Sequence, residues 1–339
     1  MTVKVSKPAI NVREELADLR KPTGIAGEAM LRAETPQEQF NLIGAGRRNF
    51  IINGNFAVTQ RGDYSSSTSV ASGAYSIDRW KSNDPFNLQR FTGQVIDGIR
   101  TNYVKVSYNG TASMGFMQLI EDKDYEVLRG QTITISAYVR TNQALFGFRL
   151  YDGSQKYGPR FVADGNWHRA TWTFTWSPSS PSYFQILFDT YQGSFPTIGS
   201  GDYMDIAMVQ VELGKVATPF EHRSYGEELA LAQRFYTRLG NDDGGFTHLM
   251  VGSAEGAGVY VVSRSLSTRM RAVPTLTVGS GVNGYTSSAG VASVNSFNTR
   301  CSRDIACISA NVTGTATLGQ AAVLYDAGAN GYIELDAEL

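Results

Sequence analysis

The stretch Thr132–Arg140, which reads TITISAYVR, decides the fold class of this chain. Ile133, Ile135, Ala137 and Val139 stand at every second position, so an extended strand here has one apolar face and one polar face. The stretches 167–176 and 183–192 repeat this alternation. Strands of this kind are typical of antiparallel sandwiches. We therefore expect a mainly β protein built on an antiparallel β sandwich.

The composition excludes several kinds of partner. The chain has 339 residues, enough for two domains, and a formal net charge of −1. Without excess positive charge, neither a nucleic acid nor an anionic membrane is an expected partner. No apolar run is long enough for a membrane-spanning helix, so no membrane insertion is expected.

Three segments differ in their sequence patterns. Residues 1–48 carry two short helix signals, each with a capping residue three positions before a glutamate, at Asn11 and Thr35. Helices this short are marginal alone in water, so we expect an extended or helical arm that folds against a partner. The alternative is a disordered leader. Residues 49–223 hold the alternating strands and form the second segment.

Residues 224–339 form the third segment, which we expect to be a smaller β-sandwich knob after a short helical hinge at 225–238. Short apolar strands alternate there with Gly and Ser turns. Asn283-Gly284 and Asn330-Gly331 are dipeptides typical of β-hairpin turns. The final run 332–339 alternates to the last residue, which predicts a strand at the end of the chain.

Several motifs in the second segment resemble known modules. Asn49–Phe56, Asp78-Arg79-Trp80, Gly165-Asn166-Trp167 and the strand 202–212 are similar to the jelly-roll carbohydrate-binding modules related to families 4 and 9. The same start, with Val211–Gly214 and Thr218–Glu221, resembles the sandwiches of bacteriophage tail fibres, and 225–339 resembles the small β domain that often follows in them. The resemblance implies a jelly-roll sandwich at 49–223.

The resemblance also implies a function. The chain is expected to be a virion fibre or spike protein, assembled in the host cytoplasm, homotrimeric, and attached through residues 1–48 to a tail, portal or capsid protein. It would adhere to a host-surface glycan or an outer-membrane protein without breaking bonds. One alternative is a head-fibre, decoration or collar protein without a receptor role. The other is a capsule depolymerase.

The polar faces of the strands supply the candidate ligand site. Jelly-roll modules use the outer face of one sheet as a shallow sugar groove, as the resemblance implies, and hydroxyl-rich ligands suit aromatic rings combined with Arg and Asp hydrogen bonds. An ordinary solvated sheet or a protein contact surface is the alternative. The candidate residues are Tyr138, Arg140, Arg149, Tyr151, Gln185, Asp189 and Tyr191.

The tryptophans are expected to serve different purposes. Trp172 and Trp176 share a face with other apolar residues, which indicates core positions, and Trp80 is expected to be a structural plug. Trp167 stands on the opposite face, at a turn, where the pattern favours neither core nor ligand.

No catalytic set or metal site is expected, and no cofactor. Asp122, Asp124 and the pair Asp242-Asp243 are interpreted as turn formers, and the three histidines are scattered. A calcium ion near Asp205 is the alternative. Cys301 and Cys307 are expected to be small core residues, with oxidation to a disulfide as the other possibility.

Overall fold

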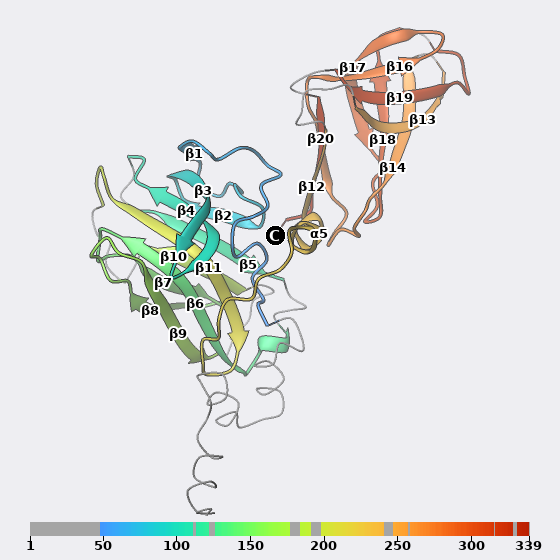
Figure 1. The fold of residues 1–339 in the computed structure, drawn as a ribbon. Coiled ribbons are helices and arrows are strands. Elements are labelled where there is room, and N and C mark those ends of the chain that lie inside the picture. Colours follow the sequence, from blue (N-terminus) through green and yellow to red (C-terminus); the bar gives the residue numbers. More distant parts are fainter. Residues whose placement is uncertain are drawn as a thin grey trace, which may run out of the picture.

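The computed structural model describes residues 48–110, 113–121, 126–176, 184–190, 198–240, 247–256, 258–314, 316–327 and 331–338. The described residues form two lobes, a β sandwich and a smaller β barrel, with helix α5 (Tyr225–Gln233) between them (Figure 1). No helix in these ranges has the length and apolar character needed to cross a membrane. The arm at residues 1–47 lies outside the described residues, so its predicted helices and virion attachment stay predictions.

The sandwich consists of two sheets whose strand pairings are antiparallel. The six-stranded sheet has the order β1 (Thr68–Val70), β3 (Phe86–Ile96), β4 (Ile99–Ser107), β11 (Tyr203–Leu213), β6 (Thr132–Thr141), β9 (His168–Thr175). The five-stranded sheet has the order β2 (Trp80–Asp84), β5 (Gly115–Ile120), β10 (Phe184–Asp189), β7 (Gly147–Tyr151), β8 (Gln155–Arg160). The predicted mainly β fold with a jelly-roll-like sandwich is confirmed.

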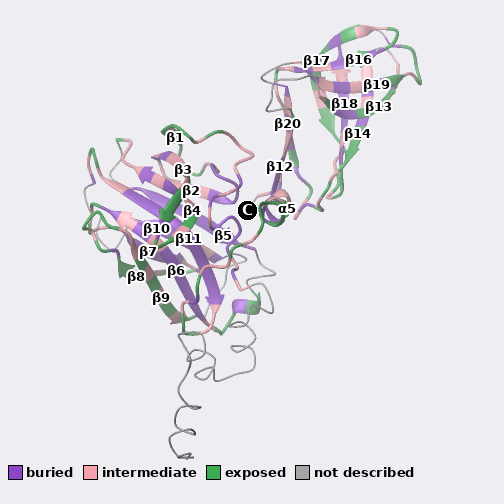
Figure 2. Ribbon diagram, viewed as in Figure 1, coloured by how far each residue is buried: buried purple, intermediate pink, exposed green. Residues whose placement is uncertain are grey.

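The core between the two sheets is aromatic, and every second residue of β6 and β10 enters it, as the sequence indicated. Much of the sandwich is buried (Figure 2). Trp80 is fully buried and stacks on Phe116 with a ring-centroid distance of 4.7 Å, which confirms the plug. Trp176 is also fully buried, and its indole N–H donates to Asp152 Oδ2 at 2.8 Å. Trp172 is half-buried against the same core. The core positions predicted for Trp172 and Trp176 are therefore confirmed.

The opening residues of the sandwich clamp strand β11. Asn49 Oδ1 accepts the backbone N–H of Ile51 at 2.9 Å and of Val211 at 3.0 Å, and its amide donates to the Val209 carbonyl at 3.0 Å. Gly54 lies so close that an added Cβ would come within 2.2 Å of the Val209 carbonyl oxygen. Only glycine fits this approach, which fixes the start of the domain against its closing strand.

The second lobe combines a three-stranded sheet with a closed barrel. The sheet has the order β12 (Tyr236–Gly240), β20 (Tyr332–Asp336), β15 (Thr275–Val278). The barrel has the order β13 (His248–Ala254), β14 (Val259–Ser265), β18 (Ile305–Val312), β17 (Gly290–Thr299), β16 (Val282–Thr286), β19 (Ala321–Asp326). The expected small sandwich is therefore a barrel instead, because alternation shows which face of a strand is apolar but not whether its sheet closes on itself.

The interpretation of Asn283-Gly284 as a hairpin turn is wrong. Both residues lie within β16, opposite Ser293 and Ala292 of β17. Gly284 serves packing inside the barrel, since a Cβ there would come within 2.7 Å of the Tyr260 ring. The absence of a side chain makes room for this fully buried tyrosine.

A buried network joins the two lobes. Helix α5 ends at Gln233, and the rest of the predicted 225–238 hinge leads into β12. Arg79 of the sandwich is 1% exposed, lies 3.5 Å from the Phe235 ring centroid and forms an ion pair with Glu338. Arg61 also reaches Glu338, at 3.2 Å, and Asp336, at 3.1 Å. The end of the chain is thereby bound to the sandwich, beside α5 in Figure 1.

Candidate functional site

The sequence-predicted site residues lie on two different sheets. Tyr138 and Arg140 point outward from β6 in the six-stranded sheet, where their alternate neighbours Val139 and Ala137 enter the core. Tyr191 lies outside the described residues. The remaining four belong to the five-stranded sheet, where they alternate with core residues of β7 and β10: Arg149, Tyr151, Gln185 and Asp189.

The outer faces of a two-sheet sandwich point in opposite directions, so these residues do not line one groove. The expectation of a single polar face is thus corrected. Alternation identifies which side chains share a side of their own strand, but it does not assign the strand to a sheet. Consecutive strands β6 and β7 belong to opposite sheets.

The five-stranded side offers little free polar surface. Arg149 and Asp189 form a buried ion pair with each other, at 8% and 0% exposure. Met117, Leu119 and Leu187 form a buried apolar cluster on the same side. At these exposures the Arg149–Asp189 pair presents little polar surface to solvent.

The six-stranded side carries four outward-facing aromatic residues and one arginine, which together we call the aromatic face: Phe91, Tyr103, Tyr138, Trp167 and Arg140. The Phe91 and Tyr103 rings stack with centroids 4.6 Å apart, and Trp167 meets Tyr103 edge-on at 5.3 Å. Register places Phe91 opposite Tyr103, and Ala207 lies between Tyr103 and Tyr138. Strands β3, β4, β11 and β6 thus contribute one continuous row.

A tight turn places Trp167 on this face. Gly165 adopts a positive φ of 77°, and its N–H donates to the Thr141 carbonyl at the end of β6. The N–H of Asn166 donates to Asp164 Oδ1 at 2.9 Å. The turn therefore leads into β9 with Trp167 half-buried beside the aromatic row.

Arg140 is the polar centre of the aromatic face. Its Nε donates to Asp205 Oδ2 at 2.8 Å, and its guanidinium carbon lies 4.9 Å from the Trp167 ring centroid. Asp205 is 1% exposed, and burial raises the pKa of this carboxyl although Arg140 opposes the rise. The Arg140 side chain remains 31% exposed. The buried carboxylate thus holds a cation whose outer edge is open to solvent.

Tyr138 closes one end of the face. Its hydroxyl donates to Asp97 Oδ2 at 2.5 Å, from the turn between β3 and β4. Burial, together with this bond, raises the pKa of Tyr138. The β3–β4 hairpin therefore folds over the sheet, and it also buries Ile96 against Met208 and Ala207.

Sequence reasoning found two of the five residues as site members and left Trp167 open. It missed Phe91 and Tyr103. The available signal was weak: Tyr103 shares the outward side of β4 with the polar residues Lys105 and Ser107. An aromatic residue on an otherwise polar side of a strand is the pattern that identifies such positions.

Among the described residues, the aromatic face adds none to the candidate metal-binding or catalytic groups. Asp205, considered as a calcium ligand, is paired with Arg140. Within the described ranges, no group of three or more His, Cys, Asp or Glu side chains could hold a metal ion. Asp122, Asp124, Asp242 and Asp243 lie outside those ranges. Cys301 and Cys307, expected to be small core residues, are free and half-buried, and Cys301 packs against the barrel core.

Comparisons with known proteins give a likeness to solved structures. No family model matches the chain, and no curated protein matches it. A xylan-binding domain of family CBM22 is 14% identical, over 46% of this chain and 99% of that one, with a TM-score of 0.32. A CBM61 module in complex with β-1,4-galactotriose is 10% identical, over 49% and 99%, with a TM-score of 0.27.

A phage protein is also among these structures. The enzymatically active domain of bacteriophage CBA120 tailspike protein 4 is 15% identical over 49% of this chain, with a TM-score of 0.31. The aligned part of this chain spans 21% of that tailspike chain. The solved structures similar to this chain thus include carbohydrate-binding modules and a phage tailspike domain.

Proposed function

We propose that this chain binds a host-surface glycan through the aromatic face, as an adhesive part of a phage virion. The observation that carries the proposal is Trp167 beside the Arg140–Asp205 pair on the outer face of the six-stranded sheet. The virion role is supported by the resemblance of the sequence motifs to tail fibres. Attachment would then use the arm at residues 1–48.

The chemistry of the aromatic face suits a sugar. The C–H face of a pyranose packs on an aromatic ring, while its hydroxyls need hydrogen-bond partners at the ring's edge. Arg140 Nη1 forms no hydrogen bond with the described residues, so its N–H groups remain available to ligand oxygens. Because Asp205 fixes the guanidinium, little side-chain entropy is lost on binding.

A binding role without bond cleavage is part of the proposal. Glycosidases need two carboxyl groups about 5 to 9.5 Å apart, acting as acid and as base or nucleophile. On the aromatic face, Asp205 is bonded to Arg140 and Asp97 accepts the Tyr138 hydroxyl. Both carboxylates already have structural partners. A capsule depolymerase is the alternative, and release of reducing ends from host capsule would reveal it.

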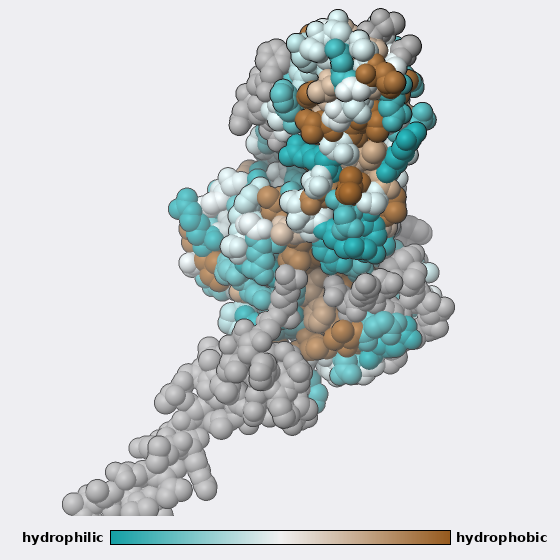
Figure 3. All heavy atoms as spheres, turned by 90° about the vertical axis from the view of Figure 1, so that its right-hand side faces the viewer, coloured by the Kyte–Doolittle hydropathy of each residue, from teal (hydrophilic) through white to brown (hydrophobic). Residues whose placement is uncertain are grey.

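The chain is further proposed to be a homotrimer whose copies meet at the barrel. Val251, Val323, Tyr285 and Val291 lie side by side on four neighbouring strands, and we call them the barrel stripe. Val251, Tyr285 and Val291 are 57%, 46% and 64% exposed. Figure 3 shows hydrophobic patches on the barrel surface. Exposed apolar rows of this kind are typical of protein interfaces.

The barrel stripe suits a second copy of the same chain. Its outward neighbours Ser253, Asn283, Ser293 and Ala321 carry no charge. Identical surfaces can therefore meet there without repulsion between like charges. A structural head-fibre, decoration or collar protein would share this assembly, and it would differ by lacking glycan affinity.

A glycan array tests the binding proposal. The wild-type chain should bind a defined set of glycans, and Trp167→Ala should weaken that binding by at least about tenfold, as expected for a central aromatic contact. The matched control is Tyr157→Ala, because Tyr157 is a 38% exposed aromatic residue on the opposite sheet. Equal loss in both variants, or no binding by the wild type, would remove the support for this face.

A further inference from the structure

The outer side of the six-stranded sheet places two cations around one buried carboxylate. Lys105 of β4 stands opposite Asp205 of β11, and Asp205 stands opposite Arg140 of β6. Lys105 points outward, because its neighbours Val104 and Val106 enter the core. Strands two apart in a sheet lie about 10 Å from each other. The long side chains of Lys105 and Arg140 can therefore approach Asp205 from both sides.

One carboxylate does not balance both of these cations. Asp205 is 1% exposed and forms its ion pair with Arg140. Burial raises the pKa of Asp205, while the charges of Arg140 and Lys105 oppose the rise. Lys105 forms no ion pair with the described residues, and its Nζ lies 4.3 Å from the Tyr203 ring centroid. The row of Lys105, Asp205 and Arg140 thus carries one positive charge in excess.

The adjacent row adds a third cation. Arg169 of β9 stands opposite Tyr138 and is exposed, and its guanidinium donates to the Thr218 carbonyl. The two acids at the rim of the aromatic face already accept hydrogen bonds, Asp97 from the Tyr138 hydroxyl and Asp164 from a backbone N–H of its own turn. These acids thus have partners, whereas donors of the two cations in the central row remain open to a ligand.

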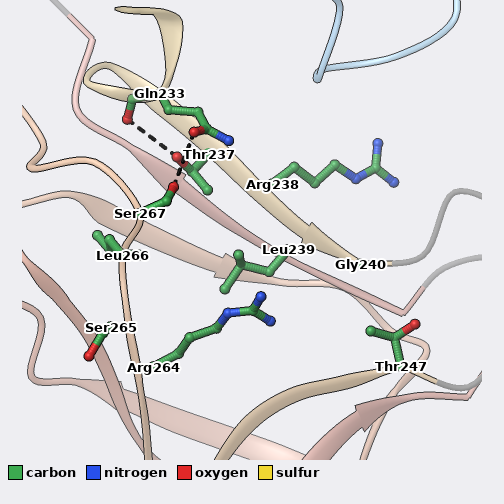
Figure 4. Close-up of a pocket in the computed structure, with 10 residues that line it drawn as sticks. All are labelled: Gln233, Thr237, Arg238, Leu239, Gly240, Thr247, Arg264, Ser265, Leu266 and Ser267. Carbon is green, nitrogen blue, oxygen red and sulfur yellow. Dashed lines mark hydrogen bonds between the residues drawn. The ribbon is translucent and has the colours of Figure 1, made fainter. Parts of the chain in front are cut away.

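Another pair of arginines lacks this convergence. Arg238 and Arg264 are among the residues that line a hollow between the barrel and the three-stranded sheet, and Figure 4 shows their guanidinium groups apart from each other. The Arg238 guanidinium lies 4.3 Å from the Tyr332 ring centroid, and Arg264 donates to the Leu249 carbonyl at 3.2 Å. The aromatic face, where two cations share one carboxylate, is therefore better suited to an anion.

We propose that the glycan bound on the aromatic face is acidic, and that Lys105 and Arg140 bind its carboxylate or phosphate groups. This assignment of the ligand rests on the glycan-binding function proposed above. Trp167 would pack on the C–H face of a sugar ring, while the neighbouring cations would donate charge-assisted hydrogen bonds to its anionic substituents. Carboxylates and phosphates share this chemistry, because both present several negatively charged oxygens to cationic donors.

A glycan array of matched pairs tests the acidic class. Each uronate-bearing oligosaccharide is printed beside its carboxyl-reduced form, and each phosphate-bearing one beside its dephosphorylated form. We expect the full chain to bind acidic members at least about tenfold more tightly than their neutral partners. The acid that is preferred separates carboxylate from phosphate. Equal binding to both members of the pairs would overturn the acidic class and leave glycan binding intact, whereas no binding to any glycan would overturn both proposals.

Variants of Lys105 assign the preference to this face. Lys105→Gln should weaken binding of the tightest acidic oligosaccharide by at least about fivefold and leave its neutral partner unaffected, because only a charge is lost. Lys105→Arg keeps the charge and should retain most of the affinity. The matched control is Lys81→Gln, since Lys81 is also half-buried and lies 5.1 Å from the Tyr75 ring centroid, but on the five-stranded sheet. An acid preference that survives Lys105→Gln, or that falls equally in Lys81→Gln, would contradict the assignment.

Discussion

At the scale of single residues, burial decides what each charged group does. Asp78 is 1% exposed and accepts two hydrogen bonds from Gln60, at 2.5 Å to the backbone N–H and 2.9 Å to the side chain. Burial raises the pKa of Asp78 to about 6, although the Gln60 bonds and the nearby Arg61 oppose the rise. The folded protein therefore holds a proton that the unfolded chain, with an aspartate pKa of about 3.9, has already released.

This shift predicts how stability changes with pH. Between about pH 4 and pH 6 the folded state binds more protons than the unfolded state, so the Asp78 contribution to stability falls as pH rises through that window. Asp78→Asn removes the titrating group, and it should flatten this part of the curve while costing about 1 kcal/mol for the lost hydrogen bond. Urea unfolding from pH 3.5 to 7 measures it, and an unchanged slope in the variant would contradict the assignment.

At the scale of strands and turns, close backbone contacts matter more than composition. Gly54 meets the Val209 carbonyl, whereas Gly226 in α5 has open space where a Cβ would stand. Gly54→Ala should therefore lower the free energy of unfolding by about 3 kcal/mol, as other steric clashes in cores do. Gly226→Ala, the matched control, should raise it by up to about 1 kcal/mol. Chemical denaturation of both variants checks the contrast, which would be absent if residues 53–55 did not clamp β11.

The strands were predictable from the sequence, but their partners were not. Alternation located the core residues of β6, β9 and β10, and it identified Trp176 as buried. It combined Arg140 with Arg149 because it carries no information on which sheet a strand joins. The Asn-Gly dipeptide wrongly indicated a turn at Asn283-Gly284, because the packing of Tyr260 against this glycine depends on residues distant in sequence. Two of the five residues of the aromatic face, Phe91 and Tyr103, were missed as well.

At the scale of the whole molecule, the last residues hold the two lobes together. Glu338 is paired with the buried Arg79 and with Arg61, and its side chain is 4% exposed. Glu338→Gln would leave Arg79 buried without a carboxylate, which costs about 3 to 5 kcal/mol when one partner of a buried pair is removed. We expect a lower midpoint in urea unfolding and a larger radius of gyration in small-angle scattering. An unchanged scattering curve and midpoint would show that the junction does not need this pair.

The oligomeric state depends on the barrel stripe, where copies of the chain are proposed to meet. If copies meet at the barrel stripe, Val291→Asp places repelling charges in the contact and should shift the oligomer toward monomer. Val216→Asp is the control, because Val216 is 59% exposed on the sandwich, away from the barrel strands. Mass photometry of both variants measures how many copies each particle contains. An oligomer that persists in Val291→Asp, or that is lost in Val216→Asp as well, would exclude the stripe as the interface.

In the function proposed above, a sugar packs on Trp167 and accepts hydrogen bonds from Arg140. A crystal structure of the chain with its best-binding array oligosaccharide tests it directly. We expect a pyranose ring over the Trp167 indole, with ring hydroxyls at hydrogen-bond distance from the Arg140 guanidinium. A sugar bound on the five-stranded side, with the aromatic face empty, would contradict it.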